Sequence, residues 1–121
     1  MNTIDKDVLF GMTTKHLVLD ESINRYFHKE SYTDFLAFKD YAANAGIDFY
    51  VTSSYRSFDD QMRIWNEKCT GKRPIYNRSG EELDVKSLSA TQVVEAIINW
   101  SALPGTSRHH WGTELDVVDA N

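Results

Sequence analysis

The sequence is poor in several features that would point to particular classes of protein. It has one cysteine, Cys69, so no disulfide can form within the chain, and cysteine usage gives no indication of the compartment. No apolar run approaches the roughly 20 residues that a membrane-spanning helix needs. The opening residues, MNTIDKDVLF, lack the basic start and the long apolar segment of a secretory signal. We therefore predict a chain without a membrane span, which either is not exported by that route or has its leader outside these residues.

Basic residues are too few for a nucleic acid to be the main partner. The 121 residues carry 13 Lys and Arg against 18 Asp and Glu, a formal charge of -5. Nonspecific binding to nucleic acids depends on neutralising many phosphates, which this balance does not favour. A hydrophobic content of 41% and an aromatic content of 12% are those of a globular protein. The length suffices for one domain with its own core.

The apolar residues that are present alternate between helical and strand-like patterns. Apolar residues recur at helical spacing, each time after a serine that suits the N-cap, at residues 31–45, 57–70 and 89–98. In the third of these segments Ser89 and Gln92 form the pattern of a capping box. Apolar and polar residues alternate, as in a half-buried strand, at residues 47–54 and 113–119. We predict three helices and two strands from these patterns.

The other parts of the chain are less regular. Leu17 to Leu19 could form a short strand, and residues 23–27 could form one or two helical turns. Residues 70–88 are polar and predict a surface excursion within one domain. Helices mixed irregularly with short strands predict an α+β fold and not a doubly wound sheet.

The stretch SRHHWGTELD, residues 107–116, contains the residues best suited to bind a metal or to take part in catalysis. A turn at Gly112 would let His109 and Asp116 converge, and imidazole and carboxylate are two of the ligand types from which a catalytic zinc takes three. Spacing alone does not choose between His109 and His110, because neighbours in an extended segment point in opposite directions. The alternative is structural. In that case the histidines flank a turn, Asp116 caps or pairs locally, and Trp111 fills the core.

The second candidate feature is SSYRS, residues 53–57, where the predicted strand passes into a helix. Arg56 could grip a carboxylate with its planar guanidinium. It could equally be a surface arginine that neutralises Asp59 or Asp60. Ser54 could line the same edge or satisfy backbone groups at the end of the strand. No serine stands in a Gly-x-Ser-x-Gly turn, so a nucleophilic triad is not indicated.

The stretches SSYRSFDDQ and IINWSALPGTSRHHWGTELDVVD, in this order, resemble the zinc D-alanyl-D-alanine carboxypeptidases of the VanY type. That group includes lysostaphin-like peptidases, the VanX dipeptidases and the hedgehog signalling domain. The family signature Ser-x-His-x-x-Gly-x-x-x-Asp is met by Ser107, His109, Gly112 and Asp116. The resemblance runs from about residue 31 to residue 121. It implies a small antiparallel sheet with helices packed on one side, and a substrate at the D-alanyl-D-alanine end of peptidoglycan stem peptides.

The same resemblance implies a role for each candidate residue. It implies that His109 and Asp116 are zinc ligands, and that Arg56 is a catalytic residue that binds the substrate carbonyl or carboxylate. It also implies that Ser107, Gln61 and Ser54 contact the substrate, and that His110 and Trp111 surround the zinc ligands. The implied location is the cell envelope or periplasm. Within this fold a D,D-dipeptidase, an L-alanyl-D-glutamate endopeptidase and a noncatalytic peptidoglycan-binding or signalling module are the alternatives.

One part of the family pattern does not occur in the sequence. In the family, a general-base glutamate and a third ligand, a histidine, stand together downstream of the aspartate, and here five residues follow Asp116. His16 and His28 match no family position. Glu114 lies two residues from a ligand and is expected to add charge there, not to act as the base. We therefore expect one peptidase domain, residues 1–121, that lacks its C-terminal part and by itself binds zinc weakly and hydrolyses little.

Overall fold

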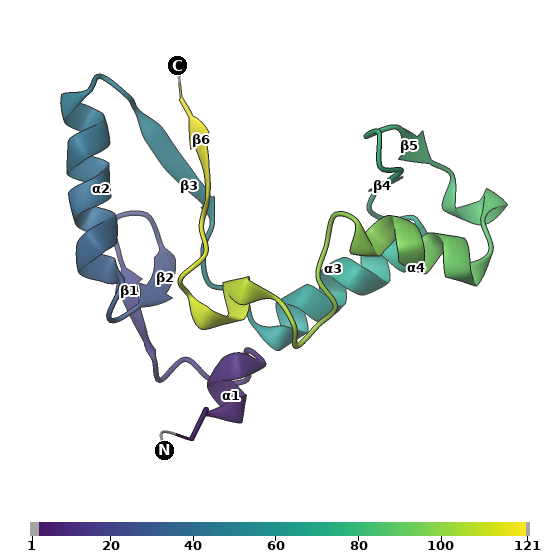
Figure 1. The fold of residues 1–121 in the computed structure, drawn as a ribbon, viewed down its shortest axis with the longest axis horizontal. Coiled ribbons are helices and arrows are strands. Elements are labelled where there is room, and N and C mark those ends of the chain that lie inside the picture. The colour runs from purple at the N-terminus through teal and green to yellow at the C-terminus, as the bar shows by residue number, and fades with distance from the viewer. Residues whose placement is uncertain (1–2, 121) are drawn as a thin grey trace. The chain divides into compact units, whose positions relative to one another are not determined.

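The structure is a computed structural model that describes residues 3–120 (Figure 1). The chain divides into two compact units, of which unit 1 comprises the residues up to Ser57 and those from Arg108 onward, and unit 2 comprises Phe58–Ser107. No helix among the described residues combines the length and the apolar character that crossing a bilayer requires. The expectation of a single peptidase domain over residues 1–121 stays a prediction, and residues 1, 2 and 121 lie outside the described part.

Unit 1 combines helices with two antiparallel strand pairs. Its described elements in chain order are α1 (Lys6–Leu9), β1 (Leu17–Asp20), β2 (Arg25–His28), α2 (Tyr32–Asn44), β3 (Phe49–Ser53), the 3-10 helix η2 (Arg108–Trp111) and β6 (Asp116–Asp119). β1 pairs with β2, and β3 pairs with β6. The second pair joins two distant parts of the sequence, so the yellow C-terminal strand of Figure 1 runs back along β3. This pairing brings the SRHHWGTELD stretch beside the end of β3.

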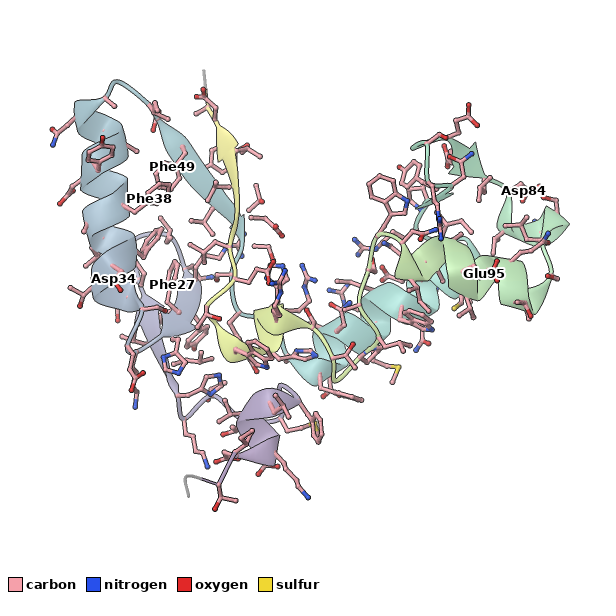
Figure 2. The ribbon with its side chains drawn as sticks, in the orientation of Figure 1. Phe27, Asp34, Phe38, Phe49, Asp84 and Glu95 are labelled. Carbon is pink, nitrogen blue, oxygen red and sulfur yellow. The ribbon has the colours of Figure 1, made fainter. Side chains whose placement is uncertain are left out.

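Aromatic residues of α2 and of the strands form the core of unit 1. Phe27 and Phe35 are buried and stack with their ring centroids 4.4 Å apart. Phe38 of α2 and Phe49 of β3 face each other with centroids 5.0 Å apart (Figure 2). Burying one such side chain contributes about 1.5 to 3 kcal/mol relative to leaving it in water. The cluster therefore holds α2 against β2 and β3.

Unit 2 is built from two helices and a short strand pair. Its elements are α3 (Phe58–Thr70), β4 (Ile75–Tyr76), β5 (Glu82–Leu83), the 3-10 helix η1 (Val85–Ser87) and α4 (Ala90–Ile98). Ile75, Val93 and Ile97 are buried together, and Trp65 and Cys69 of α3 pack against them. Cys69 is therefore a core thiol. The excursion at residues 70–88 contains β4, β5 and η1, and it supplies Ile75 to this core.

The structure confirms the α+β class, the three long helices and the two predicted strands, of which the second begins only at Asp116 and is exposed along its whole length, not half-buried. The capping box is present in both directions: the Ser89 backbone N–H donates to Gln92 Oε1 at 2.9 Å, and the Gln92 N–H donates to Ser89 Oγ at 3.2 Å. Ser31 occupies the N-cap position of α2 but makes no side-chain cap, because its Oγ donates to the His28 carbonyl. The strands of the described part form three separate two-stranded sheets.

The expectation of helical turns at residues 23–27 is wrong. Arg25–His28 is the strand β2, whose Phe27 pairs with Val18 of β1. Asn24 adopts a φ of 52°, the left-handed region that asparagine tolerates better than most residues, and reverses the chain between the two strands. Because the apolar residues of this segment are few, a helical turn and a short strand could not be separated by periodicity alone.

Candidate metal centre

The turn at Gly112 seats the SRHHWGTELD stretch against the β1–β2 hairpin. Gly112 has a φ of +76°, and its carbonyl accepts the His28 backbone N–H at 2.9 Å. A Cβ at this position would lie 2.6 Å from Leu17 Cδ2 and 2.9 Å from the His28 backbone nitrogen. Both the backbone conformation and the lack of space therefore require glycine here.

The turn brings His109 of η2 and Asp116 of β6 together. His109 Nε2 lies 3.3 Å from Asp116 Oδ2, with the histidine side chain 13% exposed and the aspartate side chain 58% exposed. The pairing of β3 with β6 shifts register between Val51 and Ser53, so that Ser53 stands opposite Asp116. Such irregularities turn side chains in new directions. The structure thus places His109 beside Asp116, at a position open to solvent on the aspartate side.

A hydrogen bond to the backbone fixes the tautomer of His109. Its Nδ1 lies 2.8 Å from the Ser54 carbonyl oxygen. A carbonyl can only accept, so Nδ1 carries the proton, and in the neutral ring the lone pair of Nε2 is directed at the Asp116 carboxylate. Two electron-rich atoms 3.3 Å apart repel each other unless a cation lies between them. A metal ion between the two atoms would relieve this repulsion.

The donor pair suits a tetrahedral divalent metal such as zinc. Two ligands that each stand 2.0 to 2.2 Å from such an ion lie about 3.3 to 3.6 Å apart, and Nε2 and Oδ2 are separated by 3.3 Å. The bond from Nδ1 to a backbone carbonyl is the outer contact that metal-binding histidines usually make. Among residues 3–120 no group of three or more His, Cys, Asp and Glu side chains could hold an ion. Within these residues, His109 and Asp116 are thus two candidate ligands.

Arg56 and His110 lie directly beside this pair. The Arg56 backbone N–H donates to the His109 carbonyl at 3.0 Å, and its Nη2 donates to Ser53 Oγ at 2.9 Å. His110 Nδ1 donates to the Arg56 carbonyl at 2.7 Å. His110 is fully buried, and burial lowers its pKa, which the bond to the Arg56 carbonyl partly opposes. His110 is therefore enclosed as a neutral donor, and His109 is the ring that faces Asp116.

Ser54 contributes to the candidate site through its backbone carbonyl more than through its side chain. Its carbonyl holds His109, while the residue is only 2% exposed and its Oγ has no hydrogen-bond partner among the described residues. Gln61 and Ser107 belong to unit 2 and are also buried. Gln61 Nε2 donates to the Ala102 carbonyl at 2.8 Å. Their predicted contacts with a substrate stay predictions.

Two contacts from the N-terminal segment hold η2 from the other side. His16 Nε2 donates to the His110 carbonyl at 3.2 Å, across 94 positions of sequence. The Trp111 indole N–H donates to the Leu9 carbonyl at 3.2 Å. Burial lowers the pKa of His16, and its hydrogen bond to the His110 carbonyl opposes this. No local pattern indicates that His16 reaches this site, so sequence reasoning missed it.

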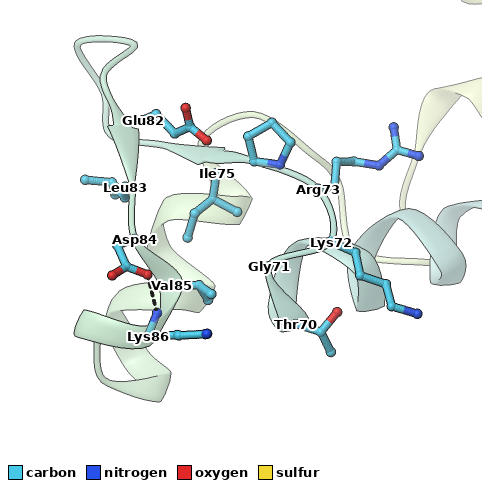
Figure 3. Close-up of a pocket in the computed structure, with 11 residues that line it drawn as sticks. Thr70, Gly71, Lys72, Arg73, Ile75, Glu82, Leu83, Asp84, Val85 and Lys86 are labelled. Carbon is cyan, nitrogen blue, oxygen red and sulfur yellow. Dashed lines mark hydrogen bonds between the residues drawn. The ribbon is translucent and has the colours of Figure 1, made fainter.

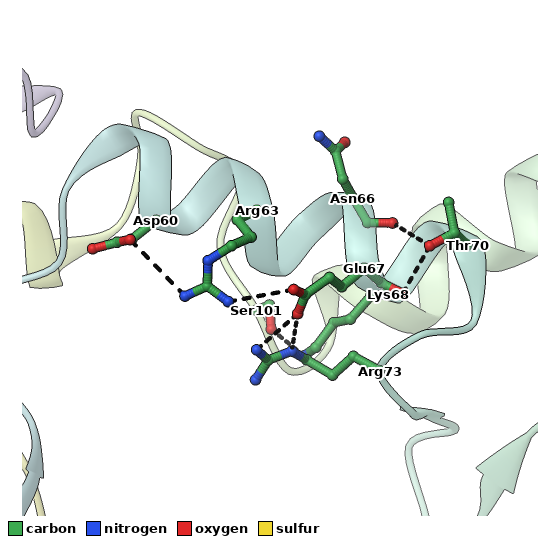
Figure 4. A network of polar contacts seen from close by, with 8 residues as sticks. All are labelled: Asp60, Arg63, Asn66, Glu67, Lys68, Thr70, Arg73 and Ser101. Atoms are coloured by element: carbon green, nitrogen blue, oxygen red, sulfur yellow. Dashed lines mark hydrogen bonds and ion pairs between the residues drawn. The ribbon is translucent and has the colours of Figure 1, made fainter.

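A recess in unit 2 is lined mostly by residues of other types than those at the His109–Asp116 pair. It has a volume of about 630 Å³, and Figure 3 shows charged residues of both signs around the apolar Ile75 and Leu83. Beside it, Glu67 accepts from Arg73 at 2.9 Å and from Arg63 at 3.4 Å (Figure 4). Arg73, and less strongly Arg63, hold the pKa of Glu67 below its usual value despite some desolvation. These are partly exposed ion pairs that share the Glu67 carboxylate.

An imidazole and a carboxylate whose donor atoms lie 3.3 Å apart, beside an arginine and on an α+β scaffold, are the kinds of group from which metallohydrolase centres are built. The model of one family, VanY: D-alanyl-D-alanine carboxypeptidase, matches residues 24–121. The chain belongs to this family, as the resemblance in its sequence predicted.

Relatives and solved structures agree with that assignment. An uncharacterized protein of Haemophilus influenzae is 34% identical over 100 residues, which cover 80% of this chain and 68% of the relative. A mutant of the vancomycin-resistance D,D-pentapeptidase VanY from a VanB-type cassette, in complex with Zn(II), is 22% identical with a TM-score of 0.67 over 89% of this chain and 56% of its own.

Two further solved proteins share the fold. VanYB in complex with D-alanine-D-alanine is 24% identical with a TM-score of 0.67, over 86% of this chain and 51% of its own. The LD-carboxypeptidase LdcB, whose solved structure reveals the molecular basis of peptidoglycan recognition, is 25% identical with a TM-score of 0.59. The match covers 87% of this chain and 44% of LdcB. The chain thus spans about half the length of the solved proteins that it matches.

Proposed function

We propose that this chain is a zinc-dependent carboxypeptidase for the D-alanyl-D-alanine end of peptidoglycan stem peptides, acting in the cell envelope or periplasm. The observation that carries the proposal is the 3.3 Å separation of His109 Nε2 and Asp116 Oδ2, with Nδ1 of the same ring bound to a carbonyl. Membership of the D-alanyl-D-alanine carboxypeptidase family supports the substrate. The Zn(II) and D-alanine-D-alanine complexes of proteins with this fold support the metal and the ligand.

Each side chain of the site has a separate task in this proposal. His109 and Asp116 hold the zinc, which when bound would polarise the scissile carbonyl and lower the pKa of a water molecule toward about 7. The Ser54 carbonyl keeps His109 in the tautomer whose Nε2 can bind a metal. Because Ser54 is 2% exposed, it acts through this carbonyl and not through its hydroxyl.

Arg56 binds the substrate and stabilises the transition state. Its planar guanidinium can donate two parallel hydrogen bonds to a carboxylate, or oppose the negative charge that develops on the carbonyl oxygen during attack. The bond from Nη2 to Ser53 Oγ restrains the guanidinium at the end of β3. A charged donor that is already oriented loses less freedom when the substrate arrives.

A noncatalytic peptide-binding module is the second candidate, and the environment of Glu114 favours it. Glu114 is the carboxylate nearest in sequence to Asp116 that could serve as a general base. Both of its oxygens are engaged by Arg108, at 2.7 Å from Nε and 3.1 Å from Nη2. A carboxylate held in this way is poorly placed to take a proton from water. In this second candidate the chain binds the peptide without cleaving it.

A peptide assay separates the two candidates. The substrate is a diacetyl-lysyl-D-alanyl-D-alanine peptide, incubated with the 121-residue chain and zinc, with binding and D-alanine release measured in parallel. His109→Ala tests the metal ligand, with His28→Ala as its matched control. Arg56→Ala tests the grip on the substrate, with Arg63→Ala as its control.

The expected result is zinc-dependent binding and a slow release of D-alanine, both of which fall at least tenfold, by about 1.4 kcal/mol or more, in His109→Ala and Arg56→Ala only. Zinc-dependent binding without release would favour the module. Activity that is unchanged in both site variants would rule out the site proposed here.

A further inference from the structure

Two consecutive histidines bind two carbonyls of the same short segment. His109 Nδ1 donates to the Ser54 carbonyl at 2.8 Å, and His110 Nδ1 donates to the Arg56 carbonyl at 2.7 Å. Between them the Arg56 backbone N–H donates back to the His109 carbonyl at 3.0 Å. Three hydrogen bonds therefore join η2 to residues 54–56. In a 3-10 helix successive side chains are about 120° apart, which lets neighbouring rings address one segment as they could not in a strand.

We propose that His110 is a positioning residue for Arg56, and that the two histidines form a clamp that fixes the arginine relative to the metal ligand His109. The inference rests on the proposed function, because it concerns the same site. It assigns the two rings different tasks. His109 faces the cation through Nε2, while His110 acts on Arg56 through the main chain.

The surroundings of His110 support this task. The residue is 0% exposed, so its ring is enclosed and cannot itself meet a substrate. Without its Nδ1–H, the Arg56 carbonyl would lose a hydrogen bond inside the protein, which destabilises the local arrangement. His16 supports the clamp from behind by donating to the His110 carbonyl at 3.2 Å. Arg56 stands just after β3. The clamp therefore fixes the backbone position of Arg56, and the contact with Ser53 Oγ fixes the orientation of its guanidinium.

Three variants separate a positioning role from a purely structural one. In His110→Asn the side-chain amide nitrogen can replace Nδ1 as the donor to the Arg56 carbonyl. In His110→Leu the volume is largely kept but the donor is lost. His28→Leu removes a histidine of β2, in the same unit, whose ring lies 5.7 Å from that of His16 but whose Nδ1 accepts from the Glu30 backbone N–H and not from residues 54–56. For each variant of the full 121-residue chain we would measure the thermal midpoint, the zinc affinity, and the affinity for a D-alanyl-D-alanine peptide with zinc present.

The clamp predicts that His110→Leu weakens peptide binding at least tenfold while zinc affinity changes less than about threefold, since outer-contact losses typically cost ten- to a hundredfold in the property they control. His110→Asn should restore peptide binding to within about threefold of the parent. Peptide binding should not change in His28→Leu. Unchanged peptide affinity in His110→Leu, or equal loss in His110→Asn and His110→Leu, would overturn the proposal.

Nitrogen-15 NMR of the imidazole rings tests the clamp without peptide or metal. The clamp requires the proton on Nδ1 in both His109 and His110, and a proton on Nε2 alone in either ring contradicts it. Failure of the proposed function would look different. The parent chain would then bind neither zinc nor the peptide, and the ring tautomers alone would decide whether the clamp exists.

Discussion

In unit 1 the polar groups of the candidate site bond to backbone carbonyls, whereas in unit 2 the prominent charged groups pair with one another at the surface. His109 and His110 each donate to a carbonyl of residues 54–56, at 2.8 and 2.7 Å. Glu67 of unit 2 instead accepts from Arg63 and Arg73, whose side chains are 56% and 40% exposed. The hydrogen bonds to carbonyls fix the orientation and the tautomer of the two imidazole rings. The ion pairs of unit 2 leave the long arginine side chains free to exchange partners.

The difference shows that the size of a recess does not identify a reactive site. The recess of unit 2 measures about 630 Å³ and contains charges of both signs, but its Asp84 is used to cap η1 by accepting the Lys86 backbone N–H. The pair His109–Asp116 occupies little space, yet its two donor atoms lie 3.3 Å apart. Directional, buried hydrogen bonds are worth about 1 to 3 kcal/mol when broken, whereas exposed ion pairs contribute about 0 to 1 kcal/mol.

Gly112→Ala should have the largest effect on unit 1. A left-handed backbone costs a non-glycine residue about 1 to 2 kcal/mol, and the new Cβ would lie 2.6 Å from Leu17 Cδ2 and 2.9 Å from the His28 backbone nitrogen. Because backbone cannot move aside cheaply, we expect the free energy of unfolding to fall by about 3 kcal/mol or more. Urea unfolding measures the change.

Gly46→Ala is the matched control. Gly46 has the same φ of +76°, but nothing lies within 4 Å of a Cβ there. It should cost about 1 to 2 kcal/mol, from the backbone alone. Equal losses in the two variants would mean that the close approach of Gly112 to the β1–β2 hairpin does not exist.

Mild acid should weaken unit 1 before unit 2. Burial lowers the pKa of His16 and of His110 below the 6.5 of an unfolded histidine. Below about pH 6.5 the unfolded chain therefore binds protons that the folded rings resist, so the free energy of unfolding falls as the pH falls, by at most about 1.4 kcal/mol per pH unit for each ring. Above that pH the contribution of both rings is complete.

Unit 2 has no histidine, since all four stand at positions 16, 28, 109 and 110. Amide exchange of the metal-free chain at about pH 5.5 and about pH 7.5, corrected for intrinsic rates, should show loss of protection in unit 1. His16→Asn should reduce that loss. The same loss in the amides of both units, with no change in His16→Asn, would contradict the assignment to these rings.

Arg73→Ala should have the smallest effect. Arg73 donates to Glu67 Oε2 from both Nε and Nη2, at 3.1 and 2.9 Å, on an exposed surface. We expect a loss of stability close to the detection limit of urea unfolding, which becomes smaller still at high salt. The Glu67 pKa, read by NMR, should rise toward its usual value when the arginine is removed. A loss of stability as large as that in Gly46→Ala would show that this network is more than a solvated pair.

The parts of the site that were predictable from sequence are those that one short segment specifies. His109, Gly112 and Asp116 lie within eight consecutive positions, so a turn at the glycine is enough to bring the two donors together. Family resemblance then favoured His109 over His110. The structure adds the reason, since His110 is fully buried and directs its Nδ1 at the Arg56 carbonyl.

The parts that were missed depend on contacts between distant residues. The bond from His16 to the His110 carbonyl joins positions 94 apart, and neither residue's neighbours indicate it. The strand β2 was missed because its identity depends on pairing with β1. An apolar residue on a helix is also not always buried, since Phe38 and Met62 are 50% and 37% exposed. Periodicity indicates which face is apolar, but the partners that cover it are set by the tertiary fold.

A zinc titration of the 121-residue chain at neutral pH, compared with that of His109→Ala and Asp116→Asn, tests the central claim most directly. If Nε2 and Oδ2 share one metal ion, the parent chain binds one zinc, and each variant binds it at least tenfold more weakly, a loss of about 1.4 kcal/mol or more. His28→Ala should bind zinc like the parent. Zinc affinity that is the same in the parent, His109→Ala and Asp116→Asn would contradict the account, because these two side chains would then not share a metal ion.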